Sequence, residues 1–163
     1  MQKKKLISNV PLEIFVDGAS RGNPGQAGAG VYIKQNDQEI VKEGFYLGEK
    51  TNNQAEYLSL VLAIFLALQE FTNLDIKPKL IITSDSELLV RQISGLYKVK
   101  NSVLKQIKDL IDLLLKNVNF EIKHVLRDKN KIADKLSNEG INKKNKLPAG
   151  FLCLLNKHNI NIL

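Results

Sequence analysis

Apolar residues recur with two different periods along the chain, and the change of period predicts where strands and helices lie. Short apolar runs bounded by Gly, Asn or Pro predict strands over residues 12–17, 28–34 and 39–47, the last two joined by an Asn-Asp-Gln turn. Two more strands are expected over 79–84 and 119–125. Because short connections join the first three strands, these strands should form an antiparallel meander.

Apolar residues spaced three and four positions apart predict helices between these strands. The helix over 54–71 is apolar on almost every side and should be buried, whereas the helix over 102–116 has a single apolar stripe. Shorter helices are expected over 86–94 and 129–138, closed by Gly95 and Gly140. From residue 141 a basic tail precedes an apolar segment that should dock on the core, as either a helix or a strand.

The order of these elements predicts an α/β fold. A helix connects the first and fourth strands, and such crossovers make the two strands parallel. If the two strands are neighbours, the acids that end them, Asp17 and Asp85, lie side by side. They would then face the crevice beyond the carboxyl ends of the strands, where open α/β sheets bind ligands.

Composition limits the classes of protein that remain. A chain of 163 residues fits one domain, with a core over about 12–140 and a tail over 141–163. The net charge of +7 favours a polyanionic partner, nucleic acid first and an anionic membrane second, although a basic surface can also serve solubility alone. One cysteine, no signal-peptide pattern and no apolar stretch long enough for a bilayer predict a cytoplasmic protein.

Four acids are candidate functional residues, and each also has a simple structural explanation. Asp17 could begin an Asp-Gly turn, and Glu56 could complete a capping box with Asn53. Asp85 could cap a helix, and Asp134 could be a solvated acid one helical turn after an asparagine.

Taken together, these acids predict a metal site. Clustered carboxylates stay ionised only if cations offset their charge. Oxygen ligands without a cluster of Cys or His select Mg²⁺ or Mn²⁺ over zinc. Two such ions roughly 3.5–4 Å apart can promote hydrolysis of a phosphodiester, and a basic surface around an acidic site suits a nuclease.

Four segments in order then resemble one family. They read D-G-A-S-R-G-N-P-G-x-A-G-A-G, T-N-N-x-A-E-Y, S-D-S-x-L-x-V-x-Q-I-x-G-x-Y-K-V-K-N and R-x-x-N-x-x-A-D-x-L-S-N, and they cover about residues 13–140. The chain resembles type 1 ribonuclease H. The resemblance implies a five-stranded mixed sheet flanked by helices, with strands one to three antiparallel and strands four and five parallel to strand one. It also implies endonucleolytic hydrolysis of the RNA strand of RNA–DNA hybrids by two metal ions, giving 5′-phosphate and 3′-hydroxyl products.

The resemblance also implies roles for particular residues. The catalytic, metal-binding acids would be Asp17, Glu56, Asp85 and Asp134, holding two Mg²⁺ or Mn²⁺ ions. Asn23, Asn52 and Asn53 would recognise RNA 2′-hydroxyls and nearby bases in the minor groove. Thr51 and Asn101 would form a phosphate pocket for the DNA strand, unless they serve only as loop and cap residues.

The chain departs from the family pattern in three places. Glu87 stands where a glutamine is common, and it would weaken an RNA contact or bind metal. The mobile histidine of many relatives is missing: His124 falls at the end of a strand, and Arg127 is a candidate substitute near the scissile phosphate or else a surface residue. The basic protrusion of some relatives is absent, so Lys98, Lys100 and Lys105 would give a weaker hybrid contact.

Three alternatives to this hypothesis remain open. A related nuclease that also cleaves double-stranded RNA is conceivable, since both duplexes expose 2′-hydroxyls in a wide minor groove. A non-catalytic hybrid-binding module would not need four acids beside phosphate. A transposase-like member of the wider fold would be expected to lack the T-N-N-x-A-E and N-P-G segments. For the ribonuclease H hypothesis, a monomer with no membrane partner is expected.

Overall fold

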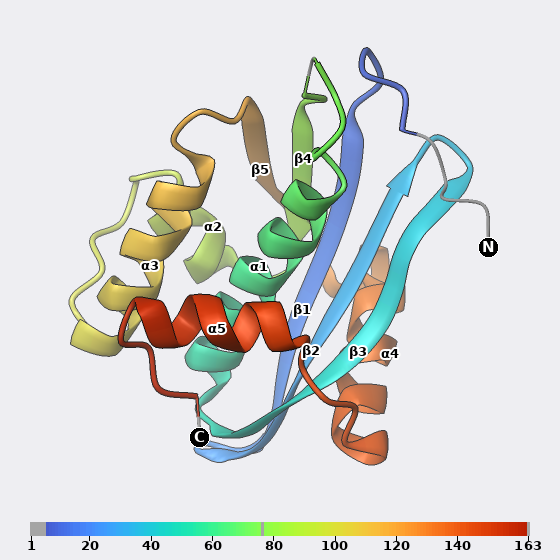
Figure 1. Ribbon diagram of the computed structural model, residues 1–163. Helices are drawn as coiled ribbons and strands as arrows, with labels where there is room; N and C mark the ends of the chain where they lie inside the picture. The colour runs from blue at the N-terminus through green and yellow to red at the C-terminus, as the bar shows by residue number, and fades with distance from the viewer. Residues whose placement is uncertain (1–5, 76, 163) are drawn as a thin grey trace.

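A five-stranded mixed sheet forms the centre of the molecule, with strand order β3-β2-β1-β4-β5 (Figure 1). The computed structural model describes residues 6–75 and 77–162. Its strands are β1 (Leu12–Gly22), β2 (Gly25–Gln35), β3 (Gln38–Lys50), β4 (Leu80–Ser84) and β5 (Phe120–His124). β1, β2 and β3 pair antiparallel, β4 pairs parallel with β1, and β5 pairs parallel with β4. The predicted fold class and strand directions are confirmed.

The first hairpin is longer than the sequence predicted. β1 does not stop at Asp17 but continues, paired with β2, down to the closing turn, so residues 18–27, between the first two predicted strands, are largely strand. Asp17 lies opposite Gly30 in this register, and because Gly18 is also in the strand, the Asp-Gly turn explanation is wrong. The parallel pairing of β1 with β4 ends at Val16 and Ser84. Asp17 therefore still lies where the parallel part of the sheet ends.

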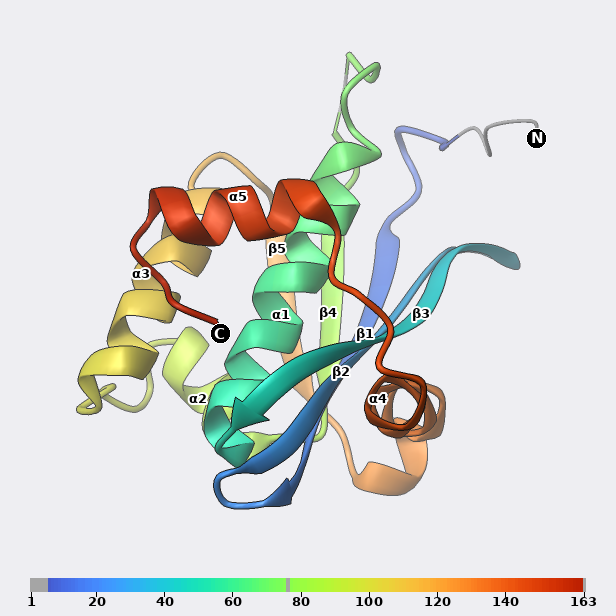
Figure 2. The same ribbon diagram turned by 60° about the horizontal axis from the view of Figure 1, so that its bottom comes forward.

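One face of the sheet is covered by three helices, and a fourth helix lies across two of them (Figures 1 and 2). These helices are α1 (Asn52–Gln69), α2 (Glu87–Ile93), α3 (Ser102–Leu115) and α5 (Ala149–Lys157). α1 is buried on almost every side, as its composition predicted, and α3 buries a single stripe. Among the described residues, no helix is both long enough and apolar enough to cross a membrane.

The apolar part of the tail docks on the core as the helix α5. Phe151 and Leu155 are fully buried, and the ring of Phe151 lies 5.6 Å from the ring of Phe65 on α1. The chain then returns past α3, where the side-chain amide of Gln106 donates to the carbonyl of Asn159 at 3.0 Å. The docking prediction is confirmed, and the choice between helix and strand is settled in favour of the helix.

The opposite face of the sheet carries α4 (Lys131–Lys143), which follows the short 3₁₀ helix η1 (Arg127–Lys129) (Figure 2). The predicted end of this helix was wrong, because Gly140 lies inside α4 rather than after it. A Cβ at Gly140 would lie 2.5 Å from the backbone of Phe45 on β3. This glycine therefore permits close packing of the helix on the sheet and does not end the helix.

Candidate active site

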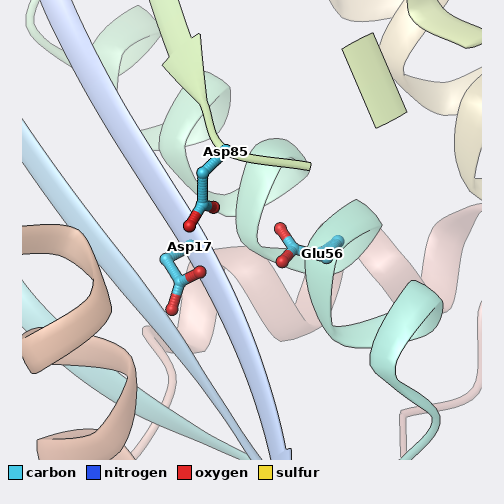
Figure 3. Close-up of side chains that lie close together, drawn as sticks. All are labelled: Asp17, Glu56 and Asp85. Carbon is cyan, nitrogen blue, oxygen red and sulfur yellow. The ribbon is translucent and has the colours of Figure 1, made fainter. Parts of the chain in front are cut away.

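Carboxylates from three separate segments meet at the end of the parallel strands. Asp17 comes from β1, Glu56 from α1 and Asp85 from the link between β4 and α2. Each offers an oxygen within 4.8 Å of the others. Figure 3 shows the three side chains directed toward one another.

Glu56 reaches this group because α1, which begins at Asn52, lies unusually close to β1. The helix is capped by Thr51, which forms a capping box with Gln54. The predicted capping box between Asn53 and Glu56 is therefore wrong. A Cβ at Gly18 would lie 2.4 Å from the backbone nitrogen of Glu56, so only glycine at this position lets α1 approach the strand so closely.

Asp85 is also free of the capping role that its position suggested. The cap of α2 is Ser86, whose hydroxyl accepts from the backbone N–H of Leu89 at 3.3 Å. The side-chain amide nitrogen of the buried Asn130 donates to the carbonyl of Val16 at 2.8 Å and lies 3.5 Å from Asp85 Oδ1. Asp85 is thus held beside the end of β1.

Asp134 lies at the edge of this group rather than inside it. Its carboxylate forms an ion pair with Arg127, with Nη2 2.7 Å from Oδ1, and its side chain is 30% exposed. It nevertheless lines the same open hollow of about 450 Å³ as the other three acids. Arg21, Arg127, Asn52 and Asn138 also line this hollow.

Burial of like charges makes the group electrostatically unfavourable without a cation. Burial, with the neighbouring charges of Asp85 and Asp134, raises the pKa of Asp17 to about 6 against the opposing effects of the hydrogen bond from Ser137 and the charge of Arg127. Burial, followed by the charges of Asp17 and Asp85, holds the pKa of Glu56 well above its usual range.

The residues fit a hard divalent cation. Glu56 Oε2 is buried and has no hydrogen-bond partner, which leaves a lone-pair acceptor directed at the site. The group offers carboxylate oxygens from three side chains and contains neither Cys nor His. Such a ligand set suits Mg²⁺ or Mn²⁺.

Comparisons with known proteins place the chain in a family. Residues 15–140 match the family model described as reverse transcriptase-like. The chain is 37% identical over 132 residues to the ribonuclease HI of Halobacterium salinarum, covering 80% of this chain and 64% of that protein. The crystal structure of LC11-RNase H1 in complex with an RNA/DNA hybrid has a TM-score of 0.76 and 39% identity, covering 81% of this chain and 97% of that one. This chain belongs to the type 1 ribonuclease H family.

Some relatives in this family are longer than the part that matches. A bifunctional protein of Mycobacterium tuberculosis is 34% identical over 133 residues, which is 78% of this chain but 35% of that protein. The chain thus spans about two thirds of the halobacterial relative and about a third of the mycobacterial one.

The predicted substrate-binding residues of this chain lie mostly around the start of α1. The side-chain oxygen of Asn23, in the turn between β1 and β2, accepts from the backbone N–H of Asn52 at 3.0 Å. Asn53 is exposed beside it, and Thr51 caps the helix. Asn101 caps α3, accepting from the backbone N–H of Leu104 at 3.0 Å, and it does not line the hollow. Their roles toward nucleic acid stay predictions.

The three auxiliary residues are placed differently from one another. Glu87 lies outside the carboxylate group and pairs with Arg91, with Oε1 2.7 Å from Nη2. His124 is exposed at the end of β5 and does not line the hollow. Arg127 alone reaches the acids, through Asp134.

Sequence reasoning missed Ser137, which contacts Asp17 from α4. The serine is fully buried, and its hydroxyl donates to Asp17 Oδ2 at 2.5 Å. Ser137 follows Asp134 by three positions, so helical spacing places both on one face. That spacing was a usable signal, but nothing in the sequence showed which face would meet β1.

Proposed function

We propose that this protein is an endoribonuclease that hydrolyses the RNA strand of RNA–DNA hybrids. The observation that carries the proposal is the meeting of Asp17, Glu56 and Asp85 within 4.8 Å at the wall of an open hollow. Three carboxylates so close together, one buried and two half-buried, serve no purpose in packing, because removing each from water costs free energy. They suit a site that holds divalent cations against a phosphodiester.

The choice of a hybrid substrate is supported by the relatives and by the surroundings of the hollow. LC11-RNase H1, with 39% identity, is a structure in complex with an RNA/DNA hybrid. Beside the acids, Asn52 lines the hollow, and its backbone N–H donates to the side-chain oxygen of Asn23. The side-chain amides of these two residues can bond to 2′-hydroxyls and base edges in a minor groove. The net charge of +7 favours a polyanion around this acidic site.

The residues of the site take distinct roles in this proposal. Asp17, Glu56 and Asp85 would hold the cations, and Asp134 would complete the site from α4. Two Mg²⁺ or Mn²⁺ ions, when bound, would supply an activated water and stabilise the departing 3′-oxygen, giving 5′-phosphate and 3′-hydroxyl ends. Arg127, which lines the same hollow, can pair with a phosphate oxygen once Asp134 turns toward a cation.

The test is gel analysis of an end-labelled RNA–DNA hybrid incubated with the protein in Mg²⁺, in Mn²⁺ and in EDTA. We expect internal cleavage of the RNA strand in both metals, no cleavage in EDTA, and an intact DNA strand. Double-stranded RNA and double-stranded DNA of the same sequence serve as matched substrates. A variant with Asp85→Asn controls for contaminating nuclease.

Each other outcome points to a different function. Cleavage of double-stranded RNA at the same rate as the hybrid would replace hybrid specificity by a broader duplex specificity. Hybrid binding that EDTA leaves unchanged, without cleavage, would indicate a binding module. Cleavage by the Asp85→Asn protein at the normal rate would overturn the site assignment.

A further inference from the structure

One face of α4 carries two polar side chains that reach the end of β1. Asn130, just before the helix, donates to the carbonyl of Val16 at 2.8 Å, and Ser137 donates to Oδ2 of Asp17 at 2.5 Å. Asn130 and Ser137 are seven positions apart, with Asp134 between them, so the three share one face of the helix. The backbone and the side chain at the end of β1 are therefore both held from α4.

The hydroxyl proton of Ser137 is available to Asp17. Ser137 Oγ also lies 2.8 Å from the carbonyl oxygen of Asp134, but a hydroxyl has a single proton to donate. That carbonyl has another donor in the side-chain amide of Asn138, at 3.0 Å. A carboxylate is a stronger acceptor than a carbonyl, so the proton serves Asp17.

The contact depends on an unusually close approach of α4 to β2. A Cβ at Gly28 would lie 2.2 Å from the carbonyl oxygen of Ser137, and a Cβ at Gly30 would lie 2.7 Å from the nitrogen of Ser137. Gly30 is the cross-strand partner of Asp17. The absence of a side chain at Gly30 thus lets a helix on the far face of the sheet touch the acid beside it.

We propose that Ser137 is a positioning residue that fixes the carboxylate of Asp17 for cation binding. The inference rests on the proposed function, since it assigns Ser137 a part in that site. Asp85 and Glu56 repel Asp17, and a carboxylate held through one oxygen cannot swing away from them. Hydrogen bonds from outside the ligand set orient metal-binding carboxylates, and losing one typically weakens metal affinity by about 10–100-fold.

The test compares Ser137→Ala with a matched change, Ser59→Ala. Both serines are fully buried within helices, and the Ser59 hydroxyl donates only to the carbonyl of Ala55, at 2.7 Å. Alanine keeps the Cβ and favours the helix, so both variants should fold. The pair therefore separates loss of a buried hydroxyl from loss of the bond to Asp17.

Three measurements are made on the wild type and both variants. Thermal unfolding in EDTA should show similar decreases in Tm, roughly 2–4 °C for each variant. Titration calorimetry with Mn²⁺, without nucleic acid, should show a Kd about tenfold higher for Ser137→Ala and within about twofold of the wild type for Ser59→Ala. The Mg²⁺ concentration that half-activates hybrid cleavage should rise by the same factor, while the KM for hybrid at saturating Mg²⁺ stays unchanged.

The calorimetry decides the proposal even if the proposed activity is absent. Equal Mn²⁺ affinities in Ser137→Ala and Ser59→Ala would overturn the positioning role. Should the wild type bind Mn²⁺ but cleave no hybrid, the proposed function fails, and the affinity difference between the two variants still reports on Ser137. A rise in KM at saturating Mg²⁺ would instead place Ser137 in substrate binding.

Discussion

α1 and α4 cover opposite faces of the sheet and each brings one acid to the site, but they contact the sheet in different ways (Figure 2). α1 packs mainly through apolar side chains, is buried on almost every side, and touches the strand backbone in its first turns, at Gly18. α4 instead lies directly on the strand backbone, where glycines leave no side chain. A Cβ at Gly44 on β3, for example, would lie 1.9 Å from the carbonyl oxygen of Leu136.

The acids on these two helices, Glu56 on α1 and Asp134 on α4, are also held in different ways. Glu56 is held in the tight carboxylate group by the apolar packing of α1, together with Asp17 and Asp85. Asp134 stands outside that group, is 30% exposed, and is held by Arg127 from the surface. The comparison indicates three acids fixed by the fold and a fourth that can adjust.

The largest expected effect tests the difference between the three fixed acids and the adjustable Asp134. Asp85→Asn should lower the rate of hybrid cleavage on the order of 10³-fold, because it removes a negative oxygen from the fixed group. Asp134→Asn should lower it by only about 10- to 100-fold, since an amide oxygen at an adjustable position still offers a ligand atom. Single-turnover rates at saturating Mg²⁺ measure both, with circular dichroism to verify folding. Equal losses would mean that Asp134 belongs to the fixed group.

The next effect concerns the backbone contact of α4. Gly30→Ala should destabilise the protein by roughly 1–3 kcal/mol, because the new Cβ would lie 2.0 Å from the carbonyl oxygen of Ala133 and must push α4 away. Gly150→Ala on α5 is the control, since its Cβ would meet side chains rather than backbone, Phe65 at 3.2 Å and Gln69 at 4.0 Å. Urea unfolding measures both. A Gly30→Ala protein as stable as the control would show that α4 can move at no cost.

Most helices and strands of this fold could be predicted from the sequence, because they depend on the local periodicity of apolar residues. The buried α1 and the striped α3 both follow directly from apolar spacing. The end of α4 was not readable, because a glycine can end a helix or permit a close contact inside one. Gly140 does the second, through a contact with Phe45 that lies far away in the sequence.

The candidate site, like the fold, could be predicted from the sequence only where it depends on local patterns. Asp17, Glu56 and Asp85 follow from motifs and from the parallel pairing of two strands. The bond from Ser137 to Asp17 depends on how closely α4 approaches β2. That distance is set by tertiary packing, which no local pattern encodes.

An effect of comparable size should appear in the pH-dependent stability of the metal-free protein. Burial raises the pKa of Asp17 to about 6 from 3.8, so folding disfavours its ionised form. The stability linked to this group is fully present below pH 4 and is lost as the pH rises through about 6. Asp17→Asn should therefore stabilise the protein in EDTA by up to about 3 kcal/mol at pH 8, and by little near pH 4.

Thermal unfolding in EDTA across this pH range measures the difference between the two proteins. Asp112→Asn is the control, because Asp112 is an exposed acid on α3 whose Oδ2 lies 2.7 Å from the ammonium of Lys108. Because this ion pair is exposed, Asp112→Asn should change the free energy of unfolding by less than about 1 kcal/mol. Stabilisation by Asp17→Asn that is equal at pH 4 and pH 8 would contradict the burial of charge at this site.

The smallest expected effect is that of Arg127→Ala, and it tests whether Asp134 is held only from the surface. The Arg127 side chain is 77% exposed, and ion pairs in such positions contribute about 0–1 kcal/mol, so the free energy of unfolding should change by less than about 1 kcal/mol. Removing a cation beside the acids should at the same time lower the Kd for Mn²⁺ by about two- to threefold. Arg91→Ala, which breaks the exposed pair with Glu87 away from the hollow, should leave Mn²⁺ binding unchanged. If Arg127→Ala instead destabilises the protein as much as Gly30→Ala does, the ion pair is part of the packing of α4, and the fourth acid is as fixed as the other three.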